Sequence, residues 1–311
     1  MSGDAVPSIA VAVATLGKSP VLQQALAAID QQRDQHQIDL VVLSQGQLEP
    51  SALEAIQRFA NQHIKEPEPL GFAAANNICL RSVLASKTPP EFVALVNDDA
   101  VLSPGWLATL VASLEAQPEA ASAQGLNLEP TTGEGEQLVD GAGIEWNARR
   151  QAVQIGHGQP ARSFEHAQGA QTRFGVSATA ALYRTAALRA CAGPNHIVFD
   201  PTLDTYYEDV DLACRLRRAG WSALVVPAAT CTHAGSSSAP SARQRLLIAN
   251  RHLVLARHLG RSYLLAAPLL ALRDLIDFGA HALSGWARVL RLLPGYLNWR
   301  RALPLSTRTT R

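Results

Sequence analysis

The sequence contains little cysteine and lacks the signals of a secreted protein. Its four cysteines, among 311 residues, are widely spaced and form no CxxC pair, so a disulfide framework is not expected. The N-terminal stretch MSGDAVPSIAVAVA has neither the basic flank nor the small-residue cleavage site of a signal peptide, and its apolar part is typical of a strand. We therefore expect reduced thiols and a cytoplasmic location.

Long apolar runs are also missing. Between Arg261 and Arg273 lie only eleven residues, SYLLAAPLLAL, and Pro268 interrupts them. A helix that spans a bilayer needs about 20 apolar residues. We expect no membrane-crossing segment there, and no internal repeat is evident.

The chain has almost no net charge, but its charges are unevenly distributed. Residues 243–311 contain twelve arginines and two aspartates, a net charge of +10, whereas the first 242 residues carry −9. The two parts therefore differ in kind. With 47% hydrophobic and 17% charged residues, the whole chain has the composition of a folded protein.

The first 130 residues alternate short apolar runs with amphipathic stretches, which predicts a mostly parallel sheet flanked by helices. Strands are expected at 8–14, 38–44 and 91–99. Helices are expected at 19–32, 51–62, 74–86 and 106–117. Such α/β sheets bind ligands beyond the carboxyl ends of their strands.

The rest of the chain divides at a serine-rich linker that follows Gly235. Residues 125–175 are polar and rich in glycine, and short antiparallel strands are expected there. An apolar segment at 175–184 and a strand at 222–233 precede the linker, and everything after it is helical in pattern. We therefore predict an α/β domain over residues 1–240 and a helical extension over 241–311.

Two interpretations of the extension stay open. Leucine interleaved with arginine, together with Trp286, Tyr296 and Trp299, is typical of interfacial helices whose aromatic rings lie at headgroup depth and whose guanidinium groups contact anionic lipid. Alternatively, the helices pack on the body and turn their arginines to water. Nucleic acid is a less expected partner, because the acidic body would repel phosphate.

Three polar residues, Asn97, Asp98 and Asp99, end the apolar strand in EFVALVNDDA. Adjacent carboxylates repel each other and a turn needs only one of them, so the pair indicates a cation or a hydrogen-bonding ligand. Mg²⁺ and Mn²⁺ commonly bind one or two carboxylates plus substrate phosphates. The competing interpretation is a simple turn, since SPGWL supplies its own helix start at Ser103.

The stretch YYEDVDLACRLRRAGW begins a helix with three acids. At ~100° per residue, Asp209 lies on the side of the leucines, whereas Asp211 lies opposite and is four residues from Arg215. We therefore predict a surface ion pair for Asp211. The helix dipole alone explains most acids in a first turn. An inward carboxylate such as Asp209 could instead accept a proton from a bound hydroxyl, with Glu208 as a cap or an orienting neighbour.

His233 ends another apolar strand, LVVPAATCTH. A lone histidine is more often structural than a ligand. At the carboxyl end of a strand, however, its neutral imidazole would suit a divalent metal.

Five segments occur in an order typical of one enzyme family. They are LGFAAANNICL, NDDAVLSPGWL, YYEDVDLACRLRRAGW, VPAATCTHAGSSS and ARQRLLIANRHLVLARHLG. From Ser8 to about Gly260 the chain resembles the inverting family 2 glycosyltransferases of the GT-A fold, particularly their rhamnosyltransferase-like bacterial members. The second segment resembles the family's DxD-type strand end, and the third its E-D-x-D-L helix.

The resemblance implies roles for single residues. Asp209 would be the general base, supported by Glu208, and Asp99 would bind the metal with His233 as a further ligand. The residues implied to line the donor pocket are Thr15, Ser44, Gly71, Asn76, Asn77, Asn97 and Asp98. Ser44 and Gln45 stand where the family usually has an Asp that contacts the nucleotide base, so dTDP, UDP and GDP donors all stay open.

The implied function is transfer of a sugar, with inversion, from a nucleotide-diphosphate donor to a hydroxyl of a glycan or lipid-linked acceptor. The resemblance implies Mg²⁺ or Mn²⁺ as cofactor and cell-surface polysaccharide or glycolipid synthesis as the setting, at the inner face of the plasma membrane if the extension binds lipid. The alternative is a GT-A-like sugar-nucleotide-binding scaffold at the membrane that has lost transfer. The altered segment VVLSQGQ allows this alternative, whereas Asp99, Asp209 and His233 argue against it.

Overall fold

The computed structural model describes residues 7–131, 135–164, 169–235 and 240–299. Most of the linker expected after Gly235 lies outside the described residues, at 236–239, and so do residues 300–311 of the extension.

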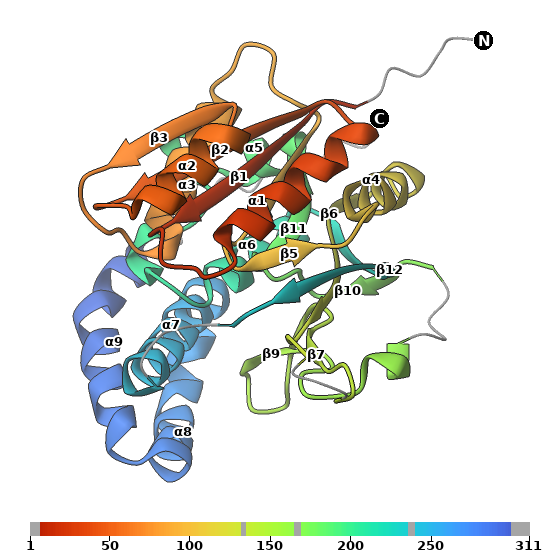
Figure 1. Ribbon diagram of the computed structural model, residues 1–311. Coiled ribbons are helices and arrows are strands. Elements are labelled where there is room, and N and C mark those ends of the chain that lie inside the picture. Colours follow the sequence, from red (N-terminus) through yellow and green to blue (C-terminus); the bar gives the residue numbers. More distant parts are fainter. Residues whose placement is uncertain (1–6, 132–134, 165–168, 236–239, 300–311) are drawn as a thin grey trace.

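One large sheet forms the body of the molecule (Figure 1). Its strand order is β10-β12-β6-β11-β4-β1-β2-β3, with β5 beside β12 and β7 beside β6. The strands are β1 (Ile9–Thr15), β2 (Ile38–Gln45), β3 (Gln62–Glu66), β4 (Phe92–Val96), β5 (Ala100–Leu102), β6 (Ala120–Leu128), β7 (Val139–Gly141), β10 (Gln171–Arg173), β11 (Ala180–Arg184) and β12 (Ser222–His233). Strands β8 (Ile144–Trp146) and β9 (Ala152–Gln154) form a separate pair. The α/β fold class expected from the sequence is confirmed.

Helices cover both faces of the sheet. They are α1 (Leu22–Asp30), α2 (Pro50–Phe59), α3 (Phe72–Leu84), α4 (Trp106–Ala116), α5 (Thr185–Cys191) and α6 (Glu208–Arg218). Alternate residues of β1 point to opposite faces: Ile9 and Val11 pack with α1, α2 and α4, whereas Ala10 and Ala12 pack with α3, α5 and α6. Because both faces are covered, the central strands read as continuous apolar runs.

Strand β6 was missed by the sequence pattern, which left the region after residue 125 without a long strand. Its sequence AASAQGLNL contains no β-branched or aromatic residue, so it lacks the usual composition of a strand. Gly125 is required there, because a Cβ would lie 2.1 Å from the carbonyl oxygen of Ala229, in the part of β12 where the pairing register shifts. Close packing between two strands therefore explains this segment better than propensity does.

The order in which strands are added to the sheet reverses between β1 and β4. From β1 it proceeds to β2 and β3 on one side, and it returns to β4 on the other side, and all four strands are parallel. Ligands of open α/β sheets bind at the carboxyl ends of the strands that flank such a switch point. Thr15 at the end of β1 and Ser44 on β2 are paired in register at this edge.

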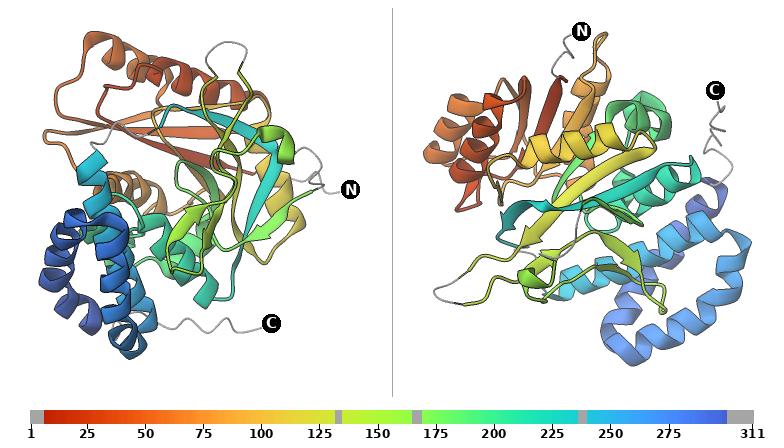
Figure 2. Two further views of the ribbon diagram at one scale, coloured as in Figure 1. Left: turned by 90° about the horizontal axis from the view of Figure 1, so that it is seen from below. Right: turned by 90° about the vertical axis from the view of Figure 1, so that its right-hand side faces the viewer.

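Three further helices, α7 (Pro240–Leu259), α8 (Arg261–Phe278) and α9 (Ala280–Trp299), form a layer beside the sheet (Figure 2). Two aromatic residues that the interfacial interpretation places at headgroup depth turn inward, as the packed alternative has it. Tyr296 is buried, and the Trp286 ring lies 4.2 Å from the His252 ring; the Trp299 side chain lies outside the described residues. None of the helices in the described ranges is both long and apolar enough to cross a bilayer.

Candidate active site

The switch point holds a pair of polar side chains from adjacent strands. The Thr15 hydroxyl donates a 2.5 Å hydrogen bond to Oδ2 of Asp98, and it accepts one from the backbone N–H of Gly17. Burial raises the pKa of Asp98 to about 6, although the Thr15 hydrogen bond acts in the opposite direction. Asp98 is thus fixed at the edge where α/β sheets bind ligands.

Asp99 faces His233. Antiparallel pairing of β5 with β12 sets Ala100 opposite His233, and Oδ1 of Asp99 lies 3.3 Å from Nε2 of the imidazole. The Nδ1 atom of His233 lies 3.0 Å from Oδ2 of Asp140 on β7. Burial disfavours the imidazolium, but hydrogen bonds to Asp140 and Asp99 outweigh burial and raise the pKa of His233 to about 9.

Asp99 and His233 are chemically suited to hold a divalent cation once the cation displaces the Nε2 proton that the two carboxylates stabilise on the imidazole. A carboxylate oxygen and an imidazole nitrogen face each other across 3.3 Å, and both side chains are less than one-fifth exposed. In the described part of the chain no cluster of three or more such ligands is arranged around one point. Two protein ligands fit a cation that completes its coordination with substrate phosphates and water. Asp140 would fix the imidazole orientation by accepting the Nδ1 proton.

Asp209 lies near the start of α6 and is connected to the switch point through two consecutive residues. Its carboxylate accepts hydrogen bonds from the backbone N–H groups of Val210 at 2.7 Å and Ala178 at 3.4 Å. The next residue, Thr179, accepts a hydrogen bond from the N–H of Asn97 at 2.8 Å. Residues 178 and 179 therefore join the helix that carries Asp209 to the strand end that carries Asn97, Asp98 and Asp99.

Glu208 is buried, and the adjacent Asp209 is half-buried. Burial raises the pKa of Asp209 to about 6, against the opposing effect of its backbone hydrogen bonds. Burial and then the charge of Asp209 raise the pKa of Glu208 well above its usual range, and Oε2 of Glu208 has no hydrogen-bond partner among the described residues. A carboxylate with a pKa near neutrality is suited to accept and release a proton.

The segment that leads into α6 is strained. Asp204, Tyr206 and Tyr207 all have positive φ, between 64° and 72°, a conformation that costs of order 1–3 kcal/mol per residue outside glycine. Asn250 on α7 holds this segment, because its amide donates to the carbonyl groups of residues 203, 205 and 206 at 2.6–2.9 Å. Helix α7 therefore fixes the entry to the helix that carries Asp209.

The same segment caps α3, the helix start expected in the donor pocket. The carbonyl of Asp204 accepts from the N–H of Ala73, and the Thr205 hydroxyl accepts from Phe72. Gly71 allows this approach, since a Cβ there would lie 1.6 Å from Oδ1 of Asp204. These N–H groups are therefore bonded to the protein itself.

Three of the residues expected in the donor pocket have internal partners. Asn77 bonds only backbone groups of residues 198 and 199, so its amide joins α3 to that segment. Asn76 donates to the carbonyl of Phe72. Ser44 lies 2.8 Å from Nε2 of His63 and, like both asparagines, is buried.

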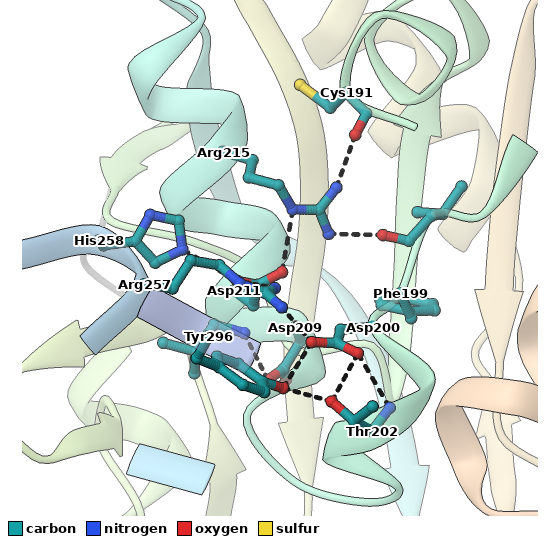
Figure 3. Close-up of polar contacts among 12 residues, drawn as sticks. Cys191, Phe199, Asp200, Thr202, Asp209, Asp211, Arg215, Arg257, His258 and Tyr296 are labelled. Atoms are coloured by element: carbon teal, nitrogen blue, oxygen red, sulfur yellow. Dashed lines mark hydrogen bonds and ion pairs between the residues drawn. The ribbon is translucent and has the colours of Figure 1, made fainter. Parts of the chain in front are cut away.

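The predicted surface ion pair of Asp211 with Arg215 is wrong in its location. The pair forms at 2.9 Å, but Asp211 is fully buried. Helix α7 covers that side of α6 and adds Arg257 at 2.7 Å and His258 at 2.9 Å from Oδ1 (Figure 3). Burial opposes ionisation, but Arg257 and Arg215 outweigh it and lower the pKa of Asp211. A helical wheel of α6 alone contains no sign of α7.

Arg257 extends this network to Asp200. Its guanidinium donates to Oδ2 of Asp200, which also accepts a 2.5 Å hydrogen bond from Tyr296 on α9. The charged pair Arg257 and Asp200 is nearly inaccessible to water. Figure 3 shows these side chains converging beneath the start of α6.

Sequence reasoning missed Asp140, Asp200, Asn250 and Arg257. Asp140 lies in a glycine-rich stretch with no periodic pattern. Asn250 and Arg257 lie in a segment whose resemblance to the family was noted without roles for its residues. The side chains that these residues would meet were not visible in the sequence, although the concentration of arginine in an apolar helix was the available signal.

The chain is similar to a known protein family and to a curated relative. Residues 7–249 match the model of the family described as "Glycosyltransferase like family 2". A curated relative, the uncharacterized protein y4gI of Sinorhizobium fredii (strain NBRC 101917 / NGR234), is 25% identical over 244 residues. The match takes in 75% of this chain, which spans a quarter of the length of that relative.

Solved structures share the fold at low identity. The mannosyltransferase PcManGT of Pyrobaculum calidifontis, in complex with GDP-Man and Mn²⁺, is similar at a TM-score of 0.54 and 17% identity, over 96% of this chain and 84% of its own. GalNAc-T7 with UDP, GalNAc and Mn²⁺ gives a TM-score of 0.57 at 10% identity, over 97% and 59%. TarS 1-349 of S. aureus gives 0.52 at 14% identity, over 95% and 87%.

Proposed function

Because the chain belongs to glycosyltransferase-like family 2, we propose that it transfers a sugar, with inversion, from a nucleotide diphosphate to an acceptor hydroxyl. One observation carries this proposal. The backbone of residues 178 and 179 bonds both Asp209 and Asn97, so a proton acceptor and a diacidic strand end belong to one rigid arrangement. Inverting transfer needs a base at the acceptor and charge stabilisation at the leaving group.

The donor diphosphate would bind at the switch point. Asp99 and His233 would hold Mg²⁺ or Mn²⁺, and Asp140 would orient the imidazole. When bound, the cation would neutralise the charge that develops on the leaving diphosphate. Thr15 and Asp98 would position the nucleotide beside it. The Mn²⁺ and the GDP-Man or UDP present in two of the similar structures support this assignment by analogy.

Asp209 would act on the acceptor. Its pKa of about 6 keeps it mostly ionised at pH 7.5 while leaving it basic enough to take the proton of a hydroxyl group that attacks the anomeric carbon. The bond from that carbon to the diphosphate oxygen breaks as the new glycosidic bond forms, and the configuration inverts. General base catalysis of this kind contributes roughly 10² to 10⁴-fold.

The nucleotide, sugar and acceptor are proposed only by class. Ser44 stands where the family usually has an Asp that contacts the base, and its side chain is paired with His63, so UDP, dTDP and GDP donors all stay open. We propose a glycan or lipid-linked acceptor in cell-envelope polysaccharide or glycolipid synthesis, met at the inner face of the plasma membrane. A sugar-nucleotide-binding scaffold without transfer is the second candidate, favoured only by the altered segment VVLSQGQ.

A donor panel tests the proposal. Nucleotide sugars with each base would be added to the protein with and without Mn²⁺, and the midpoint of thermal unfolding would be measured, since a bound ligand stabilises by mass action. We expect one nucleotide class to raise the midpoint only with Mn²⁺, and Asp99→Asn to remove the increase. Donor hydrolysis or transfer by the same sample supports the enzyme, whereas binding without turnover supports the scaffold. No response to any donor contradicts both.

A further inference from the structure

The outer surface of α8 and α9 carries most of the large exposed apolar side chains in the described part of the chain. Eleven large apolar residues are exposed in the described part of the chain, and eight of them lie on these two helices. We call these eight the apolar ridge: Leu264, Leu265, Leu269, Leu272, Leu275, Ile276, Leu283 and Leu290. Water-soluble surfaces rarely keep so many apolar side chains together unless they bind a partner.

The ridge is built into α8 by its sequence. Leu265, Leu269, Leu272 and Ile276 follow each other at spacings of four, three and four residues, which places them on one face of a helix. Leu265 is 87% exposed and Ile276 is 74% exposed. The opposite face of α8, with Tyr263 among its residues, is buried. This face of α8 therefore points away from the packed side of the helix.

A positively charged groove adjoins the ridge on α9. It is open, has a volume of about 290 Å³, and is lined by Arg245, Arg288, Arg291, Ser284 and Ala287. Leu290 directly precedes Arg291 and Leu283 directly precedes Ser284. Within the described ranges no carboxylate forms an ion pair with any of these three arginines. We call this feature the arginine groove. Arg245 and Arg291 are exposed, and Arg288 donates to the backbone carbonyl of Thr202, a neutral partner that leaves its charge uncompensated. The groove therefore presents positive charge to an external anion.

We propose that the apolar ridge and the arginine groove together dock the protein on an anionic lipid bilayer. The leucines would enter the boundary between headgroups and acyl chains, and the groove would contact lipid phosphate. The charge distribution selects this partner, because residues 243–311 carry +10 and the remaining chain −9. A second copy of this chain would bring an equal positive charge to the same surface, so an anionic bilayer is the better complement.

The helices that carry the docking surface lie on the side of the molecule toward which β1 and β12 run (Figure 1). In Figure 1 the arrowheads of β1 and β12 point to the side of the molecule where α7, α8 and α9 lie. A bilayer held by α8 and α9 would therefore lie on the side of the sheet edge that carries Thr15 and His233. This last step rests on the proposed function, since it would present a lipid-linked acceptor to Asp209. Bilayer binding itself does not depend on transfer.

Vesicle flotation tests the arginine groove. The full chain would be floated with phosphatidylcholine vesicles with and without phosphatidylglycerol, and we expect binding only to the anionic vesicles, weakened by salt. Replacing Arg245, Arg288 and Arg291 together with Gln should weaken binding on the order of 100-fold, from about 1 kcal/mol per arginine. The matched control replaces three exposed cations of the body, Arg81, Lys87 and Arg189, with Gln and should bind normally.

A second pair of variants tests the apolar ridge. Leu265→Ser combined with Ile276→Ser should reduce flotation at both low and physiological salt, whereas Val153→Ser, at a 40% exposed position on the body, should not. Circular dichroism melts would show that all variants keep the fold.

Three outcomes would overturn the proposal: equal flotation of the groove and control variants, equal binding to neutral vesicles, or a ridge-dependent dimer in light scattering without vesicle binding. Asp209→Asn should float like the natural protein. A chain that binds vesicles but transfers no sugar contradicts the proposed function alone. One that glycosylates a water-soluble acceptor but ignores anionic vesicles contradicts the docking surface alone.

Discussion

Replacing Arg257 with Met should destabilise the protein strongly. The Arg257 guanidinium is 1% exposed, bonds both Asp211 and Asp200, and lies 4.6 Å from the centre of the Tyr296 ring. Methionine fills similar space but removes the charge, which leaves Asp200 with neutral donors and Asp211 with one cation fewer. Removing one partner from a buried ion pair costs about 3–5 kcal/mol.

Chemical and thermal unfolding would measure this loss. An unfolding entropy of ~2.1 cal/mol/K per residue corresponds to about 1.5 °C per kcal/mol for a chain of 311 residues, so the midpoint should fall by about 5–8 °C. Arg218→Met, at an exposed position of α6, is the control and should change little. The pKa of Asp211 is lower in the folded protein than in the unfolded chain. Ionised Asp211 therefore contributes to the free energy of unfolding above its unfolded-state pKa, and this contribution is lost as the pH falls below that pKa. The effect of Arg257→Met should therefore shrink in acid.

A double-mutant cycle would separate the ion pair from general packing. Arg257→Met and Asp211→Asn should each destabilise, but the second change should cost less once the first is present. If Arg257→Met loses less than about 1 kcal/mol, the magnitude of a surface pair, the view that α7 fixes α6 through buried charge is refuted.

Three further predictions follow from contacts of the site. Gly71→Ala should cost about 1–3 kcal/mol in urea unfolding, because the new Cβ lies within 3.2 Å of the Asp204 Cα as well as its carboxylate; normal stability would contradict the close approach. Asp140→Ala should weaken Mn²⁺ binding about 10 to 100-fold, because the His233 ring loses the partner that fixes its orientation. Electron paramagnetic resonance would measure the affinity, and an unchanged value would show that Asp140 does not support the site. Asp209→Asn should raise the melting temperature at pH 8 and less at pH 5. The raised pKa of Asp209 penalises the folded state increasingly as the pH rises from the unfolded pKa to about 6, and fully above that; an equal gain at both pH values would contradict the shift.

The sequence pattern predicted the elements whose apolar character is local. The predicted strand at 222–233 coincides with β12, and β1, β2 and the first helices lie within a few residues of their expected positions. Periodicity works there because each element buries its own apolar face against the sheet. It fails at β6, where alanine and glycine reflect close contact with β12 that only the folded chain reveals.

The part of the site that could be predicted is the part that lies at the carboxyl ends of the parallel strands, because these ends meet at one edge of the sheet. The positions of Asn97, Asp98, Asp99 and Thr15 followed from this rule, and the pairing of β5 with β12 brings His233 to Asp99. Whether Thr15 and Asp98 bind a donor stays a prediction.

The supporting residues could not be predicted, because each acts across a long sequence separation. Asn250 bonds the segment at 203–206, and Arg257 bonds Asp200 and Asp211. In a helical wheel of α6 alone, the face opposite the leucines is taken to be exposed to solvent. Asp211 lies on that face and was therefore predicted to be at the surface. The wheel cannot show a later helix that packs on that face and supplies the compensating charge.

The most direct test of the account compares sugar transfer and donor binding in Asp209→Asn. Donor affinity would be measured by calorimetry with Mn²⁺, and transfer by single-turnover assay with the donor selected in the panel. We expect transfer to fall by roughly 10² to 10⁴-fold and donor affinity to stay within about twofold of the natural protein. Normal transfer by this variant would show that Asp209 is not the base.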